Sequence, residues 1–326
     1  MNRNNVISQS SLFVYIPCHE DFADALKQAN FLEKENEFLR NDQIKLKICI
    51  SYNGEHAEKY KSTYQNSEHR EYIFSYQLTG DINISLGLLK STFIGYDYVW
   101  ILSANDELNE GFLAEIIKPF GNQNNSNLIV FGESSGIVSI NEDDVLAHKS
   151  PYKLGLISSV IYNRKTFQTS FNQGIKYENT GWAQLAVILN ATKGENQLRA
   201  WIIPSNLVFK TSKNLPKNLN DYLVNFNKYF HSFYGLPVLI YMLREKKIAR
   251  KYFVNWYFKH IKYFYFYQYI ENKLENETKT NKYIFDSLVL KNHLSIRIIH
   301  FILIENIFAK TTVRIILNLA MKKVTT

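Results

Sequence analysis

The chain has 326 residues, 46% of them hydrophobic and 21% charged, which is typical of a folded protein with a sizeable core and more than one unit. With 13 Gly and 6 Pro it is not a low-complexity chain. Its net charge of +8 is uneven, because residues 1–204 carry 18 Lys and Arg against 23 Asp and Glu (net −5) and residues 205–326 carry 20 against 7 (net +13), so any attraction to an anionic partner belongs to the last third.

The first 134 residues alternate between short apolar segments and segments with helical spacing. Apolar runs that end at turn residues are typical of buried strands, and apolar residues three or four apart are typical of helices. The predicted strands are residues 11–17, 45–55, 71–78, 96–102 and 127–134, and the predicted helices are residues 21–40, 57–66, 83–95 and 109–120.

This alternation predicts a mostly parallel sheet with helices on both faces. In open sheets of this kind, ligands bind beyond the carboxyl ends of the strands. Polar residues follow four of the predicted strands, and the topology places them on one rim. They are His19 and Glu20, Asn53 and Gly54, Asp81 and Asn83, and Asn105 to Glu107. The sequence therefore predicts a binding site at this rim.

The pattern changes toward the C-terminus. Residues 177–192 have helical spacing from about Gly181, and residues 199–209 are typical of a strand pair interrupted by Pro204. From about residue 211 the sequence predicts successive helices with almost no strand signals. We therefore expect a boundary near residue 210, with an α/β domain over residues 10–210 and a basic, aromatic-rich helical region over residues 211–326.

The order of these segments resembles the family 2 glycosyltransferases, which have the GT-A fold. "SLFVYIPCHE" resembles the opening strand of that family, "ICISYNGE" its second strand end, and "GDINISLGLLKSTFIGYDYVWILSANDEL" the run that leads to its Asp-x-Asp region. "LGLISSVIYNRKTF" and "NTGWAQLAVIL" resemble later segments of the abequosyltransferase-like branch, which builds bacterial surface polysaccharides. The resemblance covers about residues 10–210. It implies a Rossmann-like, mostly parallel sheet followed by an α-helical C-terminal region.

The resemblance also implies an activity. Members of this family transfer a sugar, with inversion, from a nucleotide-diphosphate sugar to an acceptor hydroxyl. The product here would be a surface polysaccharide such as O-antigen, capsule or lipooligosaccharide, built on a glycan or lipid-linked oligosaccharide acceptor. The donor-binding residues that the resemblance implies are Pro17, His19, Glu20, Tyr52, Asn53, Asp81, Asn83 and Asn105.

The family's acidic motif holds a divalent cation, Mn²⁺ or Mg²⁺, that neutralises the donor diphosphate. Here the motif is thinned, because Ala104 and Asn105 stand where the family has acidic residues. Asp106 matches the last acidic position, so it is the predicted metal ligand, with Glu107 as a helper. Glu178 is the predicted catalytic base, although the adjacent Asn179 occupies the usual position of an acidic residue.

Each of these assignments has a plainer alternative. Asp106 and Glu107 would also suit the N-terminus of a helix that starts near Asn109. Tyr52, which stands where the family often has Asp, is either a base-stacking residue, with Asp81 taking the acidic role, or an ordinary turn aromatic. His19 is either a donor contact or a loop histidine. Glu178 is either the base or a surface charge, with Asp143 and Asp144 as further candidates. The alternative for the whole chain is a non-catalytic nucleotide- or glycan-binding module.

The C-terminal region mixes basic and aromatic residues, as in "KKIARKYFVNWYFKHIKYFYFYQYI". Such a helix suits an anionic membrane surface, where interfacial aromatics and basic side chains both bind. The aromatics also suit a helical core or an oligomer interface. A nucleic-acid interface is disfavoured, because no recognisable binding module accompanies the basic residues.

Cysteine content and hydrophobicity bear on the compartment. Cys18 and Cys49 lie in apolar runs, so we expect two buried thiols and no disulfide, which fits a reducing compartment. The N-terminus lacks a signal-peptide pattern, and no long uncharged apolar run predicts a membrane-spanning helix. These features favour a cytoplasmic protein that binds peripherally to the inner face of the plasma membrane.

Overall fold

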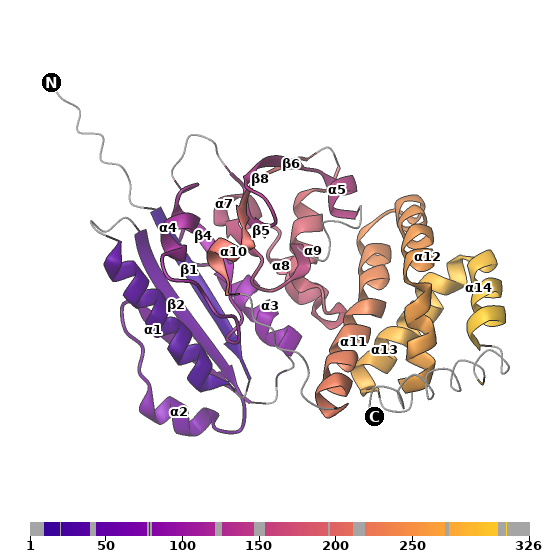
Figure 1. Cartoon of the computed structure of the whole chain (residues 1–326), viewed down its shortest axis with the longest axis horizontal. Coiled ribbons are helices and arrows are strands. Elements are labelled where there is room, and N and C mark those ends of the chain that lie inside the picture. Colours follow the sequence, from indigo (N-terminus) through magenta and orange to yellow (C-terminus); the bar gives the residue numbers. More distant parts are fainter. Residues whose placement is uncertain are drawn as a thin grey trace. The chain divides into compact units, whose positions relative to one another are not determined.

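The computed structural model of the chain contains two compact units (Figure 1). One unit comprises Met1–Glu178 and Ala183–Lys213, and the other comprises Asn179–Trp182 and Asn214–Thr326. The structure describes residues 10–19, 21–39, 44–76, 78, 80–120, 126–146, 154–194, 196–210, 219–270, 274–305 and 311. Each unit is described by itself below.

In the first unit, eight strands of the described residues form one sheet, in the order β3-β2-β1-β4-β7-β5-β8-β6. The strands are β1 (Ser10–Cys18), β2 (Ile44–Asn53), β3 (Arg70–Ser75), β4 (Tyr98–Ile101), β5 (Leu128–Gly132), β6 (Gly136–Ile140), β7 (Val160–Asn163) and β8 (Leu198–Pro204). The helices are α1 (Phe22–Phe38), α2 (Ala57–Thr63), α3 (Gly80–Ser91), α4 (Phe112–Ile117), α5 (Glu142–Leu146), α7 (Arg164–Phe167), α8 (Asn172–Lys176), α9 (Ala183–Ala191) and α10 (Ser205–Val208). Of the 3-10 turn η1 (Glu178–Thr180), Glu178 belongs to this unit and the other two residues to the second.

The predicted α/β class is confirmed. β1 pairs in parallel with β2 and β4, β2 with β3, and β5 with β8. The predicted strands of the first 134 residues are present as β1 to β5, with α1 to α4 between them. The strand pair predicted over residues 199–209 is wrong, because a single strand, β8, ends at Pro204 and a short helix, α10, follows it at once.

Two antiparallel strands make the sheet mixed. β7 lies between β4 and β5 and is antiparallel to both, and β6 is antiparallel to β8 at the edge. Because β7 runs in the opposite direction, its amino end lies at the rim where β4 and β5 have their carboxyl ends. The rim that the sequence predicts as the site is therefore also formed by the residues that precede β7.

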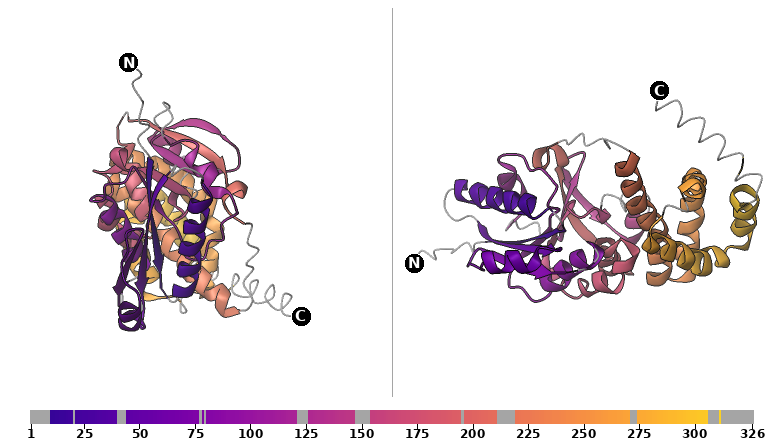
Figure 2. Two further views of the ribbon diagram at one scale, coloured as in Figure 1. Left: turned by 90° about the vertical axis from the view of Figure 1, so that its left-hand side faces the viewer. Right: turned by 90° about the horizontal axis from the view of Figure 1, so that it is seen from below.

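Helices cover both faces of the sheet (Figure 2). Alternate residues of β1, such as Val14 and Ile16, belong to one buried cluster with Ala25 and Leu32 of α1 and Phe112 of α4. The other face of β1 packs against α3. There Gly87 lies so close to the Tyr15 ring that an added Cβ would be 2.4 Å from it. The two cysteines, Cys18 and Cys49, are buried and free, as predicted.

The second unit is helical, in agreement with the successive helices predicted from residue 211. Its described elements are α11 (Leu219–Leu243), α12 (Lys246–Ile270), α13 (Asn276–Ile284), a π-helix η3 (Phe285–Val289), a 3-10 turn η4 (Leu290–Asn292), α14 (Leu294–His300) and a π-helix η5 (Phe301–Glu305). Aromatic side chains form much of its core, since Phe233, Trp256 and Phe264 are each less than 4% exposed. None of the described helices combines the length and the hydrophobicity that crossing a membrane requires.

Candidate functional site

The acidic turn after β4 is held by hydrogen bonds from several directions. Leu102 continues the sheet by donating its N–H to the carbonyl of Tyr15 (2.9 Å). The N–H of Ser103 donates to the Ser158 hydroxyl (2.9 Å), and the Gln28 side chain of α1 donates to the carbonyl of Asp106 (2.7 Å). The backbone that carries Asp106 is thus fixed from both the β7 side and the α1 side before any ligand binds.

Asp106 lines a cavity of about 370 Å³ at the predicted rim. This volume lies within the range of small-molecule sites. A side chain of β5 and side chains that follow β4 and β8 meet there with the segment that precedes β7. The lining residues are Asp106, Phe131, Leu156, Ile157, Ser158, Ser159, Ser205 and Phe209. One carboxylate, three hydroxyls and two aromatic rings therefore face a common space.

The Asp106 carboxylate is half-buried and has a limited set of partners. Burial raises its pKa above the ordinary value for Asp, and a hydrogen bond from the Ser158 hydroxyl opposes that shift. Among the described residues, no cationic side chain forms an ion pair with it. A partly desolvated carboxylate without a counter-charge stabilises a cation that binds beside it.

The capping alternative for Asp106 and Glu107 is wrong. Helix α4 begins at Phe112 rather than near Asn109, and its N-cap residue is Gly111. Glu35 of α1 supplies the carboxylate at this helix end, because its Oε2 accepts the N–H of Gly111 (2.7 Å). The charge of Asp106 is therefore not used at the N-terminus of α4.

The described residues supply only one carboxylate here, so a cation at this site would also need ligands from the substrate. No group of three His, Cys, Asp or Glu side chains able to hold a metal occurs among the described residues. Mg²⁺ in phosphate-binding sites is commonly held by one or two carboxylates together with the substrate phosphates. Asp106 fits that arrangement. Asn105 and Glu107 are both exposed on the same turn and do not line the cavity.

We expect Ser158→Ala to raise the pKa of Asp106 further above its ordinary value. The Ser158 hydroxyl stabilises the ionised carboxylate, so its removal leaves burial unopposed. Carboxyl ¹³C NMR titration measures this pKa directly. Ser159→Ala is the matched control, because the Ser159 hydroxyl lines the same cavity but donates to the Leu156 carbonyl (2.8 Å). Equal Asp106 pKa values in all three proteins would contradict the assignment.

Asn53 and Asn83 lie at the predicted rim with their side chains buried and bonded to the protein. The Asn53 side chain accepts the Leu78 N–H (2.9 Å) and donates to the Leu78 carbonyl. Asn83 donates to the carbonyl of Ser51 (2.9 Å) and accepts the hydroxyls of Ser51 (2.6 Å) and Tyr15 (3.0 Å). Both amides thus tie the strand ends together. Their role toward a donor stays a prediction.

The other predicted donor-binding residues are dispersed along the rim. Tyr52 is 2% exposed and its ring packs edge-on against Phe22, with 5.3 Å between the ring centroids. A stacking role would therefore need this side chain to move. Pro17 is half-buried within β1, and His19 is exposed just beyond it. Glu20 and the side chain of Asp81 lie outside the described residues.

The predicted catalytic base does not share the Asp106 cavity. Glu178 is half-buried at the start of η1 and is absent from the residues that line this cavity. Of the two further candidates, Asp144 belongs to a capping box at the start of α5, since its Oδ2 accepts the Asn141 N–H (3.0 Å) and its own N–H donates to Asn141 Oδ1 (2.9 Å). Asp143 is exposed on the same helix. The assignment of the base stays a prediction.

The sequence interpretation missed the segment that brings Ser158 and Ser159 to Asp106. Both serines immediately precede β7, whose apolar run is short and covers only residues 160–162. What the pattern lacked was any sign that β7 inserts between β4 and β5. The missed Ser205 follows Pro204, where its hydroxyl donates to the Gly132 carbonyl (2.9 Å).

These features together define a GT-A-like fold: a mixed, mostly parallel sheet with helices on both faces, followed by a helical C-terminal region. No protein-family model matches the sequence, and no curated protein matches it either. The likeness to known proteins is therefore one of structure.

Two solved structures of TarS from S. aureus share this fold. The structure of TarS residues 1–349 in complex with UDP has a TM-score of 0.56 and 11% sequence identity, and the match covers 93% of this chain and 90% of that one. A second TarS structure has a TM-score of 0.52 at 11% identity, covering 93% of this chain and 55% of that one. At this identity the likeness is one of fold.

Proposed function

We propose that the first unit is a glycosyltransferase domain that moves a sugar from a nucleotide-diphosphate sugar to a glycan acceptor. The observation that carries the proposal is the half-buried Asp106 carboxylate, which has no described cationic partner and opens into a cavity at the carboxyl rim of the sheet. A diphosphate with a divalent cation is the ligand that satisfies this arrangement. The GT-A-like fold and the UDP in the TarS structure support the same donor class.

In this proposal Asp106 holds Mn²⁺ or Mg²⁺ at the donor diphosphate, where the cation supplies the positive charge that a departing nucleotide diphosphate needs. Ser158 holds the Asp106 carboxylate in place and keeps its pKa from rising further. Phe131 and Phe209, whose ring centroids are 5.2 Å apart, form an apolar wall that limits water. Glu178 is the proposed base for the acceptor hydroxyl, and transfer by direct displacement inverts the anomeric carbon.

The proposed acceptor is a growing surface polysaccharide of the O-antigen, capsule or lipooligosaccharide kind, or its lipid-linked precursor at the inner face of the plasma membrane. Among the side chains of α12 that the structure describes, five basic ones are exposed, and each near an anionic bilayer contributes about 1 kcal/mol to binding. His260 of the same helix is buried, with its Nδ1 2.8 Å from the Trp256 carbonyl. The exposed five are Lys246, Lys247, Arg250, Lys251 and Lys259.

We expect UDP to bind the protein only when Mn²⁺ or Mg²⁺ is present, because the Asp106 carboxylate repels a bare diphosphate. Isothermal titration of UDP into the full chain, with the cation and with excess chelator, measures this dependence. Titrations with the diphosphates of guanosine, cytidine and thymidine identify the base. If none of the four nucleoside diphosphates binds in the presence of Mn²⁺, the proposal is contradicted.

A non-catalytic binding module is the second candidate. The thinned acidic motif and the absence of a second carboxylate from the described cavity lining favour it. Cation-dependent binding of a nucleotide diphosphate, together with neither hydrolysis nor transfer of the corresponding nucleotide-sugar, would identify the chain as such a module.

A further inference from the structure

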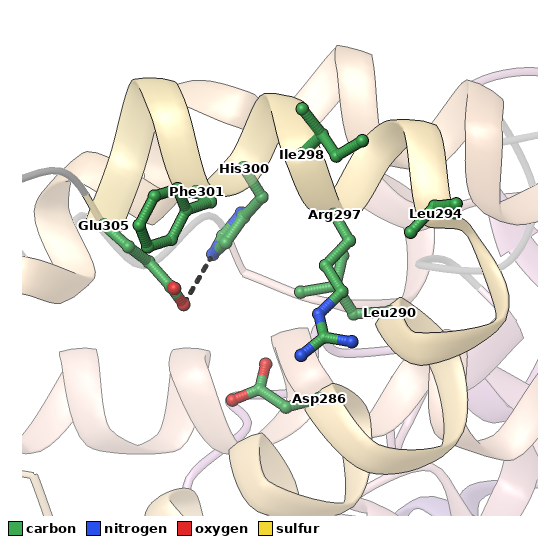
Figure 3. Close-up of a pocket in the computed structure, with 8 residues that line it drawn as sticks. All are labelled: Asp286, Leu290, Leu294, Arg297, Ile298, His300, Phe301 and Glu305. Carbon is green, nitrogen blue, oxygen red and sulfur yellow. Dashed lines mark ion pairs between the residues drawn. The ribbon is translucent and has the colours of Figure 1, made fainter.

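A second cavity lies wholly within the helical unit and has no part in the proposed transfer site. Its volume is about 570 Å³, which is in the range of small-molecule sites. Figure 3 shows charged side chains from two segments facing one space, with apolar side chains beside them. The lining residues are Asp286, Leu290, Leu294, Arg297, Ile298, His300, Phe301 and Glu305.

The polar groups of this cavity are only partly paired. The Arg297 guanidinium forms no hydrogen bond or ion pair with any described residue, although Figure 3 places it near the Asp286 carboxylate. Asp286 binds Lys282 through one oxygen, while its Oδ1 is buried without a hydrogen-bond partner in the described part of the chain. His300 lies 3.6 Å from Glu305, with its other nitrogen 2.9 Å from the Tyr257 hydroxyl.

The backbone around this cavity is unusual. Asp286 lies in the π-helix η3, and Phe301 and Glu305 lie in the π-helix η5. Such segments are rare and occur frequently at functional sites. Two of them on opposite walls of one cavity indicate a binding site rather than a packing gap.

The charges exclude simple ions as the preferred ligand. An anion that pairs with Arg297 would meet the carboxylates of Asp286 and Glu305, and a cation that pairs with those would meet Arg297. Hydroxyl groups satisfy both kinds of partner, because each donates one hydrogen bond and accepts others. Leu294, Ile298 and Phe301 are 69%, 52% and 58% exposed and offer an apolar surface to the C–H face of a sugar ring.

We infer that this cavity is a carbohydrate-binding site, in which Arg297 donates to sugar oxygens, Asp286 accepts from sugar hydroxyls and Phe301 packs against the ring. The ligand class is a neutral mono- or oligosaccharide. The choice of carbohydrate rests on the proposed glycosyl transfer, since a site of this kind in the helical unit would bind part of the acceptor glycan.

Saturation-transfer NMR on the full chain tests the inference, with N-acetylglucosamine, galactose, rhamnose, lactose and maltose as probes. We expect transfer to at least one of them, and about tenfold weaker binding in Arg297→Ala and in Asp286→Asn, since each loses a charge-assisted hydrogen bond. Lys291→Ala is the control, because this exposed charge on η4 does not line the cavity. Arg297 is itself exposed, so its substitution is expected to leave the fold intact.

Three results would overturn the inference: no transfer to any probe, binding that Arg297→Ala and Asp286→Asn leave unchanged, or an equal loss of binding in Lys291→Ala. Loss of folding stability in both variants without saccharide binding in the unaltered chain would identify Arg297 and Asp286 as a structural pair. A separate measurement of UDP binding shows whether the proposal of a donor site in the first unit is wrong instead. Asp106→Asn is expected to leave saccharide binding unchanged.

Discussion

Asp106→Asn is expected to abolish cation-dependent UDP binding and to lower sugar transfer by about 10²–10³-fold, the usual effect of removing one electrostatic stabiliser of a transition state. Asn keeps the size of the side chain and an oxygen that faces the cavity, but it removes the only negative charge among the residues that line it. Isothermal titration with UDP and Mn²⁺, together with donor turnover, measures both effects.

The same substitution is expected to stabilise the fold slightly at neutral pH. Burial raises the pKa of Asp106 above its unfolded value, so its favourable contribution is fully present below the unfolded pKa and is lost as pH rises through the folded pKa. At neutral pH the ionised, half-buried carboxylate therefore opposes folding. The unfolding free energy of Asp106→Asn should fall less than that of the unaltered chain as pH rises from about 4, the ordinary pKa of Asp.

Glu107→Gln is the matched control for charge. Glu107 is exposed on the same turn and lies outside the cavity, so its substitution should change UDP affinity far less. Mn²⁺ with UDP should raise the urea midpoint of the unaltered chain and of Glu107→Gln, but not that of Asp106→Asn. Unchanged UDP binding in Asp106→Asn would remove Asp106 from the site.

The parallel half of the sheet could be predicted because each strand there carries a strong local signal. β1, β2 and β4 are apolar runs that end at polar turns, and helical periodicity separates them. β6 and β7 were missed because their signals are weak. β7 is only four residues long, and four of the five residues of β6 are exposed, so neither segment shows a clear alternation of buried and exposed residues.

The candidate site could be predicted only where it follows the strand ends. Asp106 stands beyond β4, and the periodicity of that segment is enough to place it at the rim. Ser158 is 58 residues from the Trp100 side chain that donates to its carbonyl (2.9 Å), and nothing local in the sequence announces that pairing. The insertion of β7 between β4 and β5 determines which polar residues face Asp106. This insertion produces no periodic pattern in the sequence, so it could not be predicted.

Burial distinguishes Asn53 and Asn83 from the exposed residues on the same rim. A polar residue after a strand is equally compatible with holding a ligand and with joining strand ends, and the sequence pattern does not distinguish them. Asn83 is 3% exposed and bonded on all sides, whereas Asn105 is exposed on the turn that carries Asp106. The number of protein partners, rather than the position along the chain, distinguishes a structural amide from one that is free to bind.

Asn83→Ala is therefore expected to lower the free energy of unfolding by about 3 kcal/mol or more, because each buried polar group left without a partner costs about 1–3 kcal/mol. The Tyr15 and Ser51 hydroxyls would lose their acceptor, and the Ser51 carbonyl would lose a donor. Burial raises the pKa of Tyr15 far above its ordinary value, so its hydroxyl stays protonated and must donate at any physiological pH. Urea unfolding measures the loss.

Asn105→Ala is the control, since this amide is exposed and its substitution should change stability by less than about 0.5 kcal/mol. If Asn83 instead binds the donor, Asn83→Ala would weaken UDP binding at unchanged stability. The hydrogen-bond network predicts the opposite result. The free energy of unfolding of Asn83→Ala falls, whereas its UDP affinity, measured where both proteins are folded, stays close to that of the unaltered chain. This comparison separates the residues that build the rim from those that use it.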